Sequence, residues 1–202
     1  MIIYDSSSET VFGPFSLKLD AKPDKCLLIF DDEIWDDYVL TNKNLATFSA
    51  KNTHGKTFDT YRYLDMNGEK ILLVYPTTGA AGSVCDMELL IASGIKKFVA
   101  LCTCGRLDKN IAKNTIILPT SAYREEGTSY HYLPDSDDTE VDKSLLQKAK
   151  SVFDKTTLTT IEGKIWTTDA VYRETYGKVK LMQERGCLGV DMELSALIAL
   201  AR

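Results

Sequence analysis

The chain has 202 residues, of which 44% are hydrophobic and 26% are charged, a composition typical of a folded globular protein. Its net charge of −5 argues against a nucleic-acid-binding protein and against binding to an anionic membrane surface. Two histidines and an odd number of cysteines, five, favour neither a metal site nor a disulfide framework. We therefore expect a cytoplasmic protein without metal, nucleic-acid or membrane partners.

The N-terminal third predicts an irregular start followed by strands. Residues 1–24 are polar and irregular, and we expect them to form a strap over the edge of the domain. The apolar run at 26–30 ends in acids and predicts a buried strand that leads into a helix. Residues 57–64 and 71–75 predict two further strands, joined by a hairpin turn at Asn67-Gly68.

From residue 77 onward, the pattern predicts helices that alternate with strands. The expected elements are a helix at 84–91 with Gly94 as its C-cap, a strand at 98–102, a strand at 115–118, an acidic surface loop at 135–142, an amphipathic helix at 145–153, a strand at 159–167, a helix at 178–185, a strand at 188–190 and a terminal helix. The strand at 98–102 lacks polar alternation, as in a sheet covered on both faces. The whole predicts one α/β domain, residues 1–202, whose mixed and mostly parallel central sheet is flanked by helices.

Two segments with small residues follow predicted strands, where α/β sheets gather their ligands. The stretch from Gly79 to Ser83 opens a helix, so its backbone N–H groups could hold an anion or a sugar hydroxyl. Close packing of helix on strand would explain the same small residues. Thr103 and Gly105 follow the next strand and could bind phosphate or a ribose oxygen, or simply form a turn.

Two polar segments occur later in the chain. Residues 123–132 combine Arg124 with acids, hydroxyls and aromatic rings, which suits a planar base but equally a solvated loop with an internal ion pair. Asp191-Met192-Glu193 leads from a short strand into the terminal helix. Glu193 could accept hydrogen bonds from vicinal sugar hydroxyls while Met192 packs on the sugar; the alternative is that Asp191 is the N-cap of the helix and Glu193 an acid of its first turn.

In order and spacing, these segments resemble the nucleoside phosphorylase superfamily, which includes uridine phosphorylases, purine nucleoside phosphorylases and nucleosidases. The resemblance spans roughly residues 70–202. Asp191-Met192-Glu193 resembles the family's ribose-binding Glu-Met-Glu, which implies that Glu193 is the catalytic residue holding the ribose hydroxyls and that Met192 lies under the sugar. Thr103 corresponds to a residue that contacts phosphate and ribose, and Gly105 and Gly79 are the other implied phosphate ligands.

The base side of the resemblance uses two segments. Arg124, Gly127, Ser129 and His131 match the Arg-x-x-Gly-x-Ser-x-His pattern of uridine phosphorylases. Residues 168–172 resemble the segment that lines the base pocket, where Val171 replaces an aromatic residue. The implied base-binding residues are Arg124, Val171, Tyr172, Arg173 and Glu174.

Three departures from the family pattern concern phosphate and the departing base. Asp31-Asp32-Glu33 stands where the family has a Gly-Asp-Pro-x-x-Arg loop, and Ala100 stands where it has another arginine. The chain ends at Arg202, before the family's C-terminal strand and helix and the acid that they carry, so we expect either missing elements or a partner subunit over the terminal helix. These departures put turnover in doubt.

The leading hypothesis is a pentosyltransferase of nucleoside salvage that cleaves the N-glycosidic bond of a ribonucleoside. Inorganic phosphate would be its co-substrate, and no other cofactor is expected. The alternatives are a nucleosidase, in which water replaces phosphate, and a non-catalytic nucleoside-binding protein. The resemblance also implies a homo-oligomer, a dimer or higher.

Overall fold

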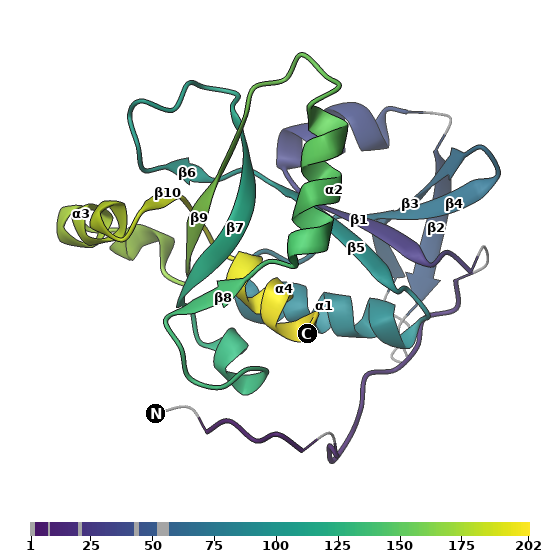
Figure 1. The fold of residues 1–202 in the computed structure, drawn as a ribbon. Helices are drawn as coiled ribbons and strands as arrows, with labels where there is room; N and C mark the ends of the chain where they lie inside the picture. The colour runs from purple at the N-terminus through teal and green to yellow at the C-terminus, as the bar shows by residue number, and fades with distance from the viewer. Residues whose placement is uncertain (1–2, 8, 20–21, 43–44, 52–56) are drawn as a thin grey trace. The chain divides into compact units, whose positions relative to one another are not determined.

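The computed structural model describes residues 3–7, 9–19, 22–42, 45–51 and 57–202. Contacts between Cα atoms divide the chain into two compact units. Unit 1 comprises residues 1–6, 79–81 and 104–202, and unit 2 comprises residues 7–78 and 82–103. Each unit carries one five-stranded sheet (Figure 1), and each is described by itself.

The sheet of unit 2 combines antiparallel strands on one side with parallel strands on the other. Its order is β2 (Ala46–Lys51), β3 (Thr57–Met66), β4 (Glu69–Val74), β1 (Lys25–Phe30) and β5 (Lys97–Cys102). β1 runs parallel to both β4 and β5, whereas β3 runs antiparallel to β2 and β4. The predicted hairpin turn is confirmed: Asn67 and Gly68 have φ of 57° and 85°, the positive values of a two-residue hairpin loop.

Two helices accompany this sheet, η1 (Ile34–Leu40) with π-type hydrogen bonding and α1 (Ala80–Ala92). The backbone N–H of Ile34, the first residue of η1, donates to Asp31 Oδ1 at 2.7 Å, so an acid that follows β1 binds the start of the predicted helix. α1 ends before Gly94, whose φ of +100° suits a glycine after a helix. The core around η1 consists of Ile29, Trp35, Val39, Leu45 and Leu73.

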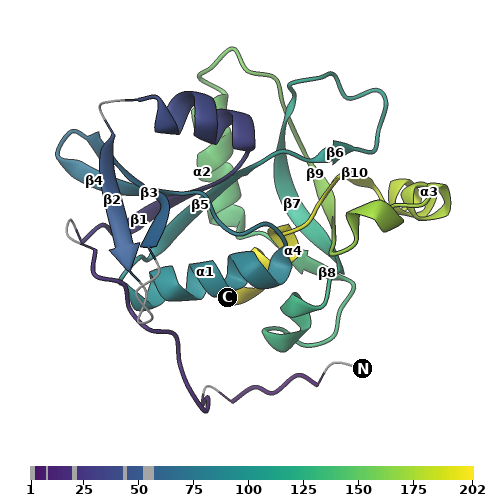
Figure 2. The same ribbon diagram turned by 180° about the vertical axis from the view of Figure 1, so that it is seen from behind.

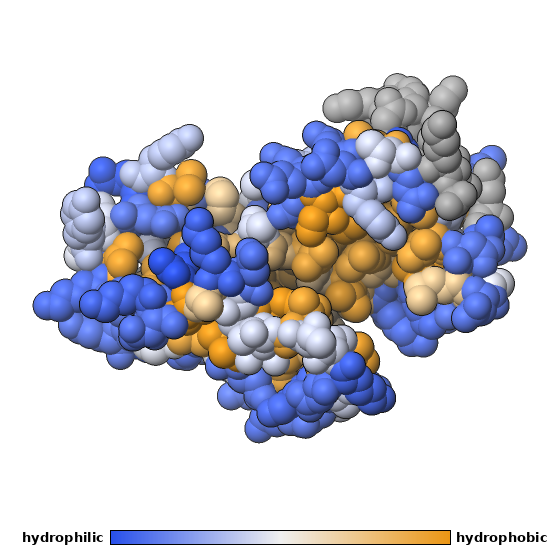
Figure 3. All heavy atoms as spheres, turned by 90° about the horizontal axis from the view of Figure 1, so that it is seen from above, coloured by the Kyte–Doolittle hydropathy of each residue, from blue (hydrophilic) through white to orange (hydrophobic). Residues whose placement is uncertain are grey.

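One expectation for unit 2 is wrong, and one strand was not predicted. β5 lies at the edge of its sheet, and its Val99 and Leu101 side chains are 65% and 41% exposed rather than covered. Figure 3, a view from above, shows hydrophobic residues in orange at the surface, with hydrophilic residues in blue around them. The apolar run therefore predicted the strand correctly, but it did not predict which elements cover the faces of that strand. The strand β2 was not predicted, although residues 46–51 (ATFSAK) alternate apolar with polar residues, as a strand does.

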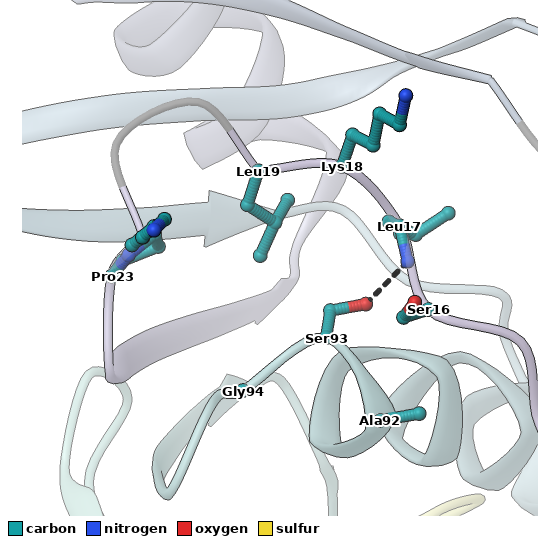
Figure 4. A pocket seen from close by; sticks show the side chains of 9 residues that line it. Ser16, Leu17, Lys18, Leu19, Pro23, Ala92, Ser93 and Gly94 are labelled. Atoms are coloured by element: carbon teal, nitrogen blue, oxygen red, sulfur yellow. Dashed lines mark hydrogen bonds between the residues drawn. The ribbon is translucent and has the colours of Figure 1, made fainter.

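The predicted strap contains neither helix nor strand at residues 9–19, and a hydrogen bond joins it to Ser93, directly after α1. The backbone N–H of Leu17 donates to Ser93 Oγ at 2.7 Å, and Leu17 and Leu19 are buried (Figure 4). A hollow of about 660 Å³ lies here, lined by Ser16, Leu17, Lys18, Leu19, Lys22, Pro23, Ala92, Ser93 and Gly94. The strap's residues 1–2, 8 and 20–21 lie outside the described residues.

The sheet of unit 1 has parallel strands at its centre and antiparallel strands at its edges. Its order is β6 (Gly105–Arg106), β10 (Cys187–Asp191), β9 (Thr160–Thr168), β7 (Ile116–Glu125) and β8 (Asp138–Glu140). β9 runs parallel to β10 and β7. β8 lies in the predicted acidic loop, where its Thr139 is buried. The fold class is confirmed as α/β with mixed sheets flanked by helices; one domain over residues 1–202 stays a prediction.

Three α-helices belong to unit 1: α2 (Lys143–Phe153), α3 (Tyr176–Glu184) and α4 (Leu194–Leu200). α3 lies beside β10 in both ribbon views (Figures 1 and 2). α2 has no buried residue, so the amphipathic pattern correctly predicted a helix but not how far its apolar face is buried. α4 contacts β7, β8 and β9 and buries Ser195, Ala196, Leu197 and Ala199. Unit 1 thus covers much of the terminal helix itself.

Candidate functional site

The carboxyl ends of three parallel strands meet at one edge of the unit 1 sheet. In the register of these strands, Glu125 of β7 pairs with Thr168 of β9, and Thr167 of β9 pairs with Asp191 of β10. The segments that leave the three strands therefore start side by side. This is the place where α/β sheets bind ligands, and three of the segments that the sequence singled out lie there: residues 123–132, 168–172 and 191–193.

Glu193 is the central carboxylate of this edge. Its side chain is only 5% exposed. Oε1 accepts a hydrogen bond from the backbone N–H of Gly79 at 2.7 Å, and Oε2 accepts one from the N–H of Met192 at 3.3 Å. Burial raises the pKa of Glu193, and these two N–H groups act in the opposite direction. The result is a buried acceptor with fixed orientation, next to the half-buried Met192.

Gly79 provides its N–H because of an unusual backbone conformation. Its φ is +92°, a region that glycine adopts without steric cost and that other residues rarely adopt. The residue stands immediately before α1 and belongs to unit 1. The structure thus brings together Gly79 and Glu193, two predicted site residues, as a hydrogen-bonded pair.

Asp191 is also buried, and hydrogen bonds satisfy its carboxyl group. Thr167 Oγ1 donates to Oδ1 at 2.7 Å, and the backbone N–H of Leu194 donates to Oδ2 at 3.0 Å. Burial raises the pKa of Asp191 to about 7, more than these hydrogen bonds lower it. Asp191 therefore binds the first residue of α4, although the residue at the N-cap position of that helix is Glu193 and not Asp191, as the helix-capping interpretation expected.

Arg124 is buried against its own loop, with an exposed fraction of 2%. Its Nε donates to Ser129 Oγ at 2.8 Å, and one terminal nitrogen donates to the carbonyl of Pro134 at 2.8 Å. The guanidinium also lies 4.0 Å from the centre of the Tyr130 ring, a cation–π distance. Most of its hydrogen-bonding capacity is therefore used within residues 124–136.

The other predicted base-binding residues lie in and just after η3 (Val171–Arg173). Val171, Tyr172 and Arg173 are exposed, Tyr172 at 97%, and Glu174 is half-buried. The backbone N–H of Gly127 donates to Asp169 Oδ2 at 3.0 Å, which ties the start of this segment to the end of β7. The structure thus places an exposed aromatic ring and an exposed guanidinium directly after β9.

The predicted phosphate-binding residues after β5 belong to different units. Thr103 is exposed and lies in unit 2. Gly105 starts β6 in unit 1 and pairs with Val190; a Cβ at this position would meet Val190 Cγ1 at 2.8 Å. Packing against β10 is thus sufficient to explain the glycine.

The sequence pattern did not identify Glu126, Thr167 and Ser195 as site residues, but all three lie at this edge. Ser195 Oγ donates to Glu126 Oε1 at 2.8 Å, and the N–H of Ser195 donates to Thr167 Oγ1 at 3.1 Å. The exposed fractions of these side chains range from 0 to 4%. A serine in the first turn of an otherwise apolar helix was the available signal, but its partners are set by strand register.

Two further findings bear on ligands and membranes. Within the described ranges, no group of three or more His, Cys, Asp or Glu side chains could hold a metal ion. Among the helices of those same residues, none is both long and apolar enough to cross a membrane.

The comparisons with known proteins agree on one family. The family model described as the phosphorylase superfamily matches residues 35–202. The chain is 30% identical over 122 residues to purine nucleoside phosphorylase DeoD-type 1 of Shewanella oneidensis, covering 60% of this chain and 52% of that protein. A DeoD-type purine nucleoside phosphorylase of Clostridium novyi is 30% identical over 119 residues, covering 58% and 51%.

A solved structure has the same fold. The uridine phosphorylase of Vibrio fischeri superimposes with a TM-score of 0.75 at 19% identity, covering 89% of this chain and 73% of that chain. The matched region spans about half the length of the curated relatives.

Proposed function

Because the chain belongs to the phosphorylase superfamily, we propose that it binds a ribonucleoside and cleaves its N-glycosidic bond, with phosphate as the acceptor of the sugar. The observation that carries the proposal is the buried Glu193 carboxylate at the carboxyl end of β10. A buried carboxylate is costly unless a partner compensates it, so its retention at a ligand-binding edge favours a role in binding.

Glu193 would hold the sugar. Each carboxylate oxygen has two lone pairs, and the N–H groups of Gly79 and Met192 use one on each oxygen. The remaining capacity suits the vicinal hydroxyls of a ribose. Met192 would pack its thioether side chain against the apolar face of the sugar. The contact with Gly79 favours a role for Gly79 in orienting Glu193 rather than in holding phosphate.

The base would be recognised by Val171, Tyr172, Arg173 and Glu174. The exposed ring of Tyr172 offers a stacking surface, and the Arg173 and Glu174 side chains can hydrogen-bond to a base edge. We assign Arg124 instead to holding the loop at residues 124–136, because that loop already uses most of its donors. The matched relatives are purine nucleoside phosphorylases and a uridine phosphorylase, so probes of both base classes are needed.

In this reaction the bond to the base breaks while the sugar acquires oxocarbenium character. Glu193 would keep the ribose in the reactive orientation, which places the anomeric carbon in line with the attacking anion. The Gly105 backbone, which belongs to the same unit as Glu193, would bind that anion. Hydrogen bonds from the base-binding segment would stabilise charge on the departing base.

A second candidate, hydrolysis, rests on the acids Asp31-Asp32-Glu33, which stand in the sequence where the family resemblance implies a phosphate-binding loop. Asp32 accepts a hydrogen bond from the Tyr75 hydroxyl, and Asp31 accepts one from the N–H of Ile34. Three carboxylates in a row would repel a phosphate dianion, whereas water carries no such penalty. The third candidate, a nucleoside-binding protein without turnover, is the outcome if neither acceptor supports cleavage.

The deciding experiment measures base release from uridine, inosine and methylthioadenosine, with and without phosphate. Strict dependence on phosphate is expected; release without phosphate would favour the nucleosidase. Saturable binding without base release would favour the non-catalytic protein. Glu193→Ala is the control variant, and nucleoside binding unchanged by it would refute the sugar assignment.

We also propose that the protein is a cytoplasmic homo-oligomer, a dimer or higher, as its family resemblance implies. Light scattering coupled to size-exclusion chromatography tests the oligomeric state directly. A mass of 22.6 kDa at micromolar concentration would identify a monomer and refute this proposal.

A further inference from the structure

Three consecutive residues, the last of β7 and the two after it, bind β9, α4 and the segment that follows β9. Glu125 Oε2 accepts a hydrogen bond from Trp166 Nε1 at 2.8 Å. Glu126 accepts one from Ser195 of α4, and the N–H of Gly127 donates to Asp169 after β9. The end of β7 therefore connects the proposed base segment with the proposed sugar segment.

Glu126 is the buried member of the three, with an exposed fraction of 4%. Both of its carboxylate oxygens have partners: Oε1 accepts from Ser195 Oγ at 2.8 Å, and Oε2 accepts from the N–H of Ser129 at 2.9 Å. Hydrogen bonds to a carboxylate are shorter and stronger than neutral ones, and burial strengthens them further. This pair of bonds fixes Ser195 relative to η2 (Thr128–His131), which contacts α4.

Ser195 is two residues from Glu193 and is fully buried. Its hydroxyl reaches Glu126, while its N–H donates to Thr167 Oγ1 at 3.1 Å. Ser195 is thus held from two strands at once. A displacement of this residue would rotate the first turn of α4 and with it the carboxylate of Glu193.

We propose that Glu126 is a positioning residue, which acts through Ser195 to set the orientation of the Glu193 carboxylate. This inference rests on the proposed role of Glu193 in ribose binding. It predicts that Glu126 governs the contribution of the sugar hydroxyls to binding without contacting the nucleoside. Misplacement of a binding group by about 1 Å can cost about 100-fold in rate, so the effect should be large enough to measure.

The test compares affinity for uridine with affinity for 2′,3′-dideoxyuridine, and likewise for a purine pair. This ratio reports the contacts to the hydroxyls, whereas general destabilisation lowers both affinities together. Glu126→Ala and Ser195→Ala are each expected to lower the ratio about tenfold or more. Glu126→Gln is expected to retain it, because the amide can accept from Ser129 and donate to the Ser195 hydroxyl. Glu184→Ala, a change on the exposed side of α3, is the matched control.

The double variant Glu126→Ala/Ser195→Ala decides whether Glu126 acts through Ser195. If it does, the double variant is no worse than the poorer single variant, because both changes remove one interaction. Additive losses, or an unchanged ratio in a folded Glu126→Ala, would overturn the inference. If Glu126→Ala does not fold, the affinity ratio of Ser195→Ala is compared with that of the wild type, and an unchanged ratio overturns the inference.

Glu193→Ala separates this inference from the proposed function. A ratio that Glu193→Ala leaves unchanged refutes the ribose assignment and this inference with it. A ratio that falls with Glu193→Ala but not with Glu126→Ala or Ser195→Ala refutes the positioning role alone.

Discussion

The backbone N–H of Gly79 donates a 2.7 Å hydrogen bond to Glu193 Oε1 across 114 residues of sequence. Glycine is suited to this place, because φ at Gly79 is +92°. The bond ties the start of α1 to the residue before α4. It orients the carboxylate on which the proposed sugar site depends, and each member of the pair gives a prediction.

Replacing Glu193 by Ala should weaken nucleoside binding by about 10- to 100-fold, because hydrogen bonds to a charged group contribute about 1.5–3 kcal/mol. Titration calorimetry with uridine and inosine measures the loss. Glu184→Ala, on the exposed surface of α3, should bind like the wild type. Equal affinity of the two variants would contradict the sugar assignment.

Replacing Gly79 by Ala should lower the free energy of unfolding by about 1–2 kcal/mol, because a Cβ is unfavourable at positive φ. Crowding does not contribute, since the added Cβ would meet no atom within 4 Å. Gly177→Ala in α3 is the matched control: that position is equally open but helical, and Ala should stabilise it by up to about 1 kcal/mol. Urea denaturation of both variants checks the opposite signs.

The stability of the protein should depend on pH through Asp191. Its carboxyl stays protonated up to a pKa of about 7 in the folded chain, against an ordinary value of 3.8. Between these values the folded state binds more protons than the unfolded state. The contribution of Asp191 to the free energy of unfolding therefore falls as pH rises from about 4 to about 7, by up to about 1.4 kcal/mol per pH unit, and levels off above that.

Asp191→Asn removes this titration, so the variant should lose less stability than the wild type between pH 5 and pH 7.5. Denaturant midpoints are measured for each protein at both pH values. The change with pH is compared within each protein, so a constant loss of stability from a weakened Leu194 hydrogen bond cancels. Identical pH dependence in the two proteins would show that Asp191 titrates normally.

Arg124 and Arg173 should separate stability from ligand binding. Arg124→Ala should cost about 2–4 kcal/mol of stability, because it leaves the Ser129 hydroxyl and the Pro134 carbonyl without their buried donor. Arg173→Ala, at an exposed position, should change stability by less than about 0.5 kcal/mol but alter the preference among bases. Thermal melts and affinities for uridine and inosine are measured for both variants. A loss of base preference in Arg124→Ala without a loss of stability would instead assign base recognition to Arg124.

Local pattern predicted most elements of the fold. The apolar run at residues 26–30 became β1, and the Asn67-Gly68 dipeptide became the turn between β3 and β4. Where the prediction failed, the sequence pattern did not show which other elements pack against the segment. β5 is as apolar as a buried strand but lies at an edge, and α2 has an apolar stripe although none of its residues is buried. Periodicity describes a segment and not what packs against it.

The sequence by itself determined which chemical groups stand at the carboxyl ends of the strands. The succession of apolar runs and polar residues placed Glu193 at the start of the last helix. The tertiary structure decided how those groups are paired: Glu193 with Gly79, Ser195 with Glu126, and Arg124 with its own loop rather than with solvent. The physical reason is that the Glu193–Gly79 and Ser195–Glu126 pairs join residues 114 and 69 apart in the sequence, and only the folded chain brings them within hydrogen-bonding distance.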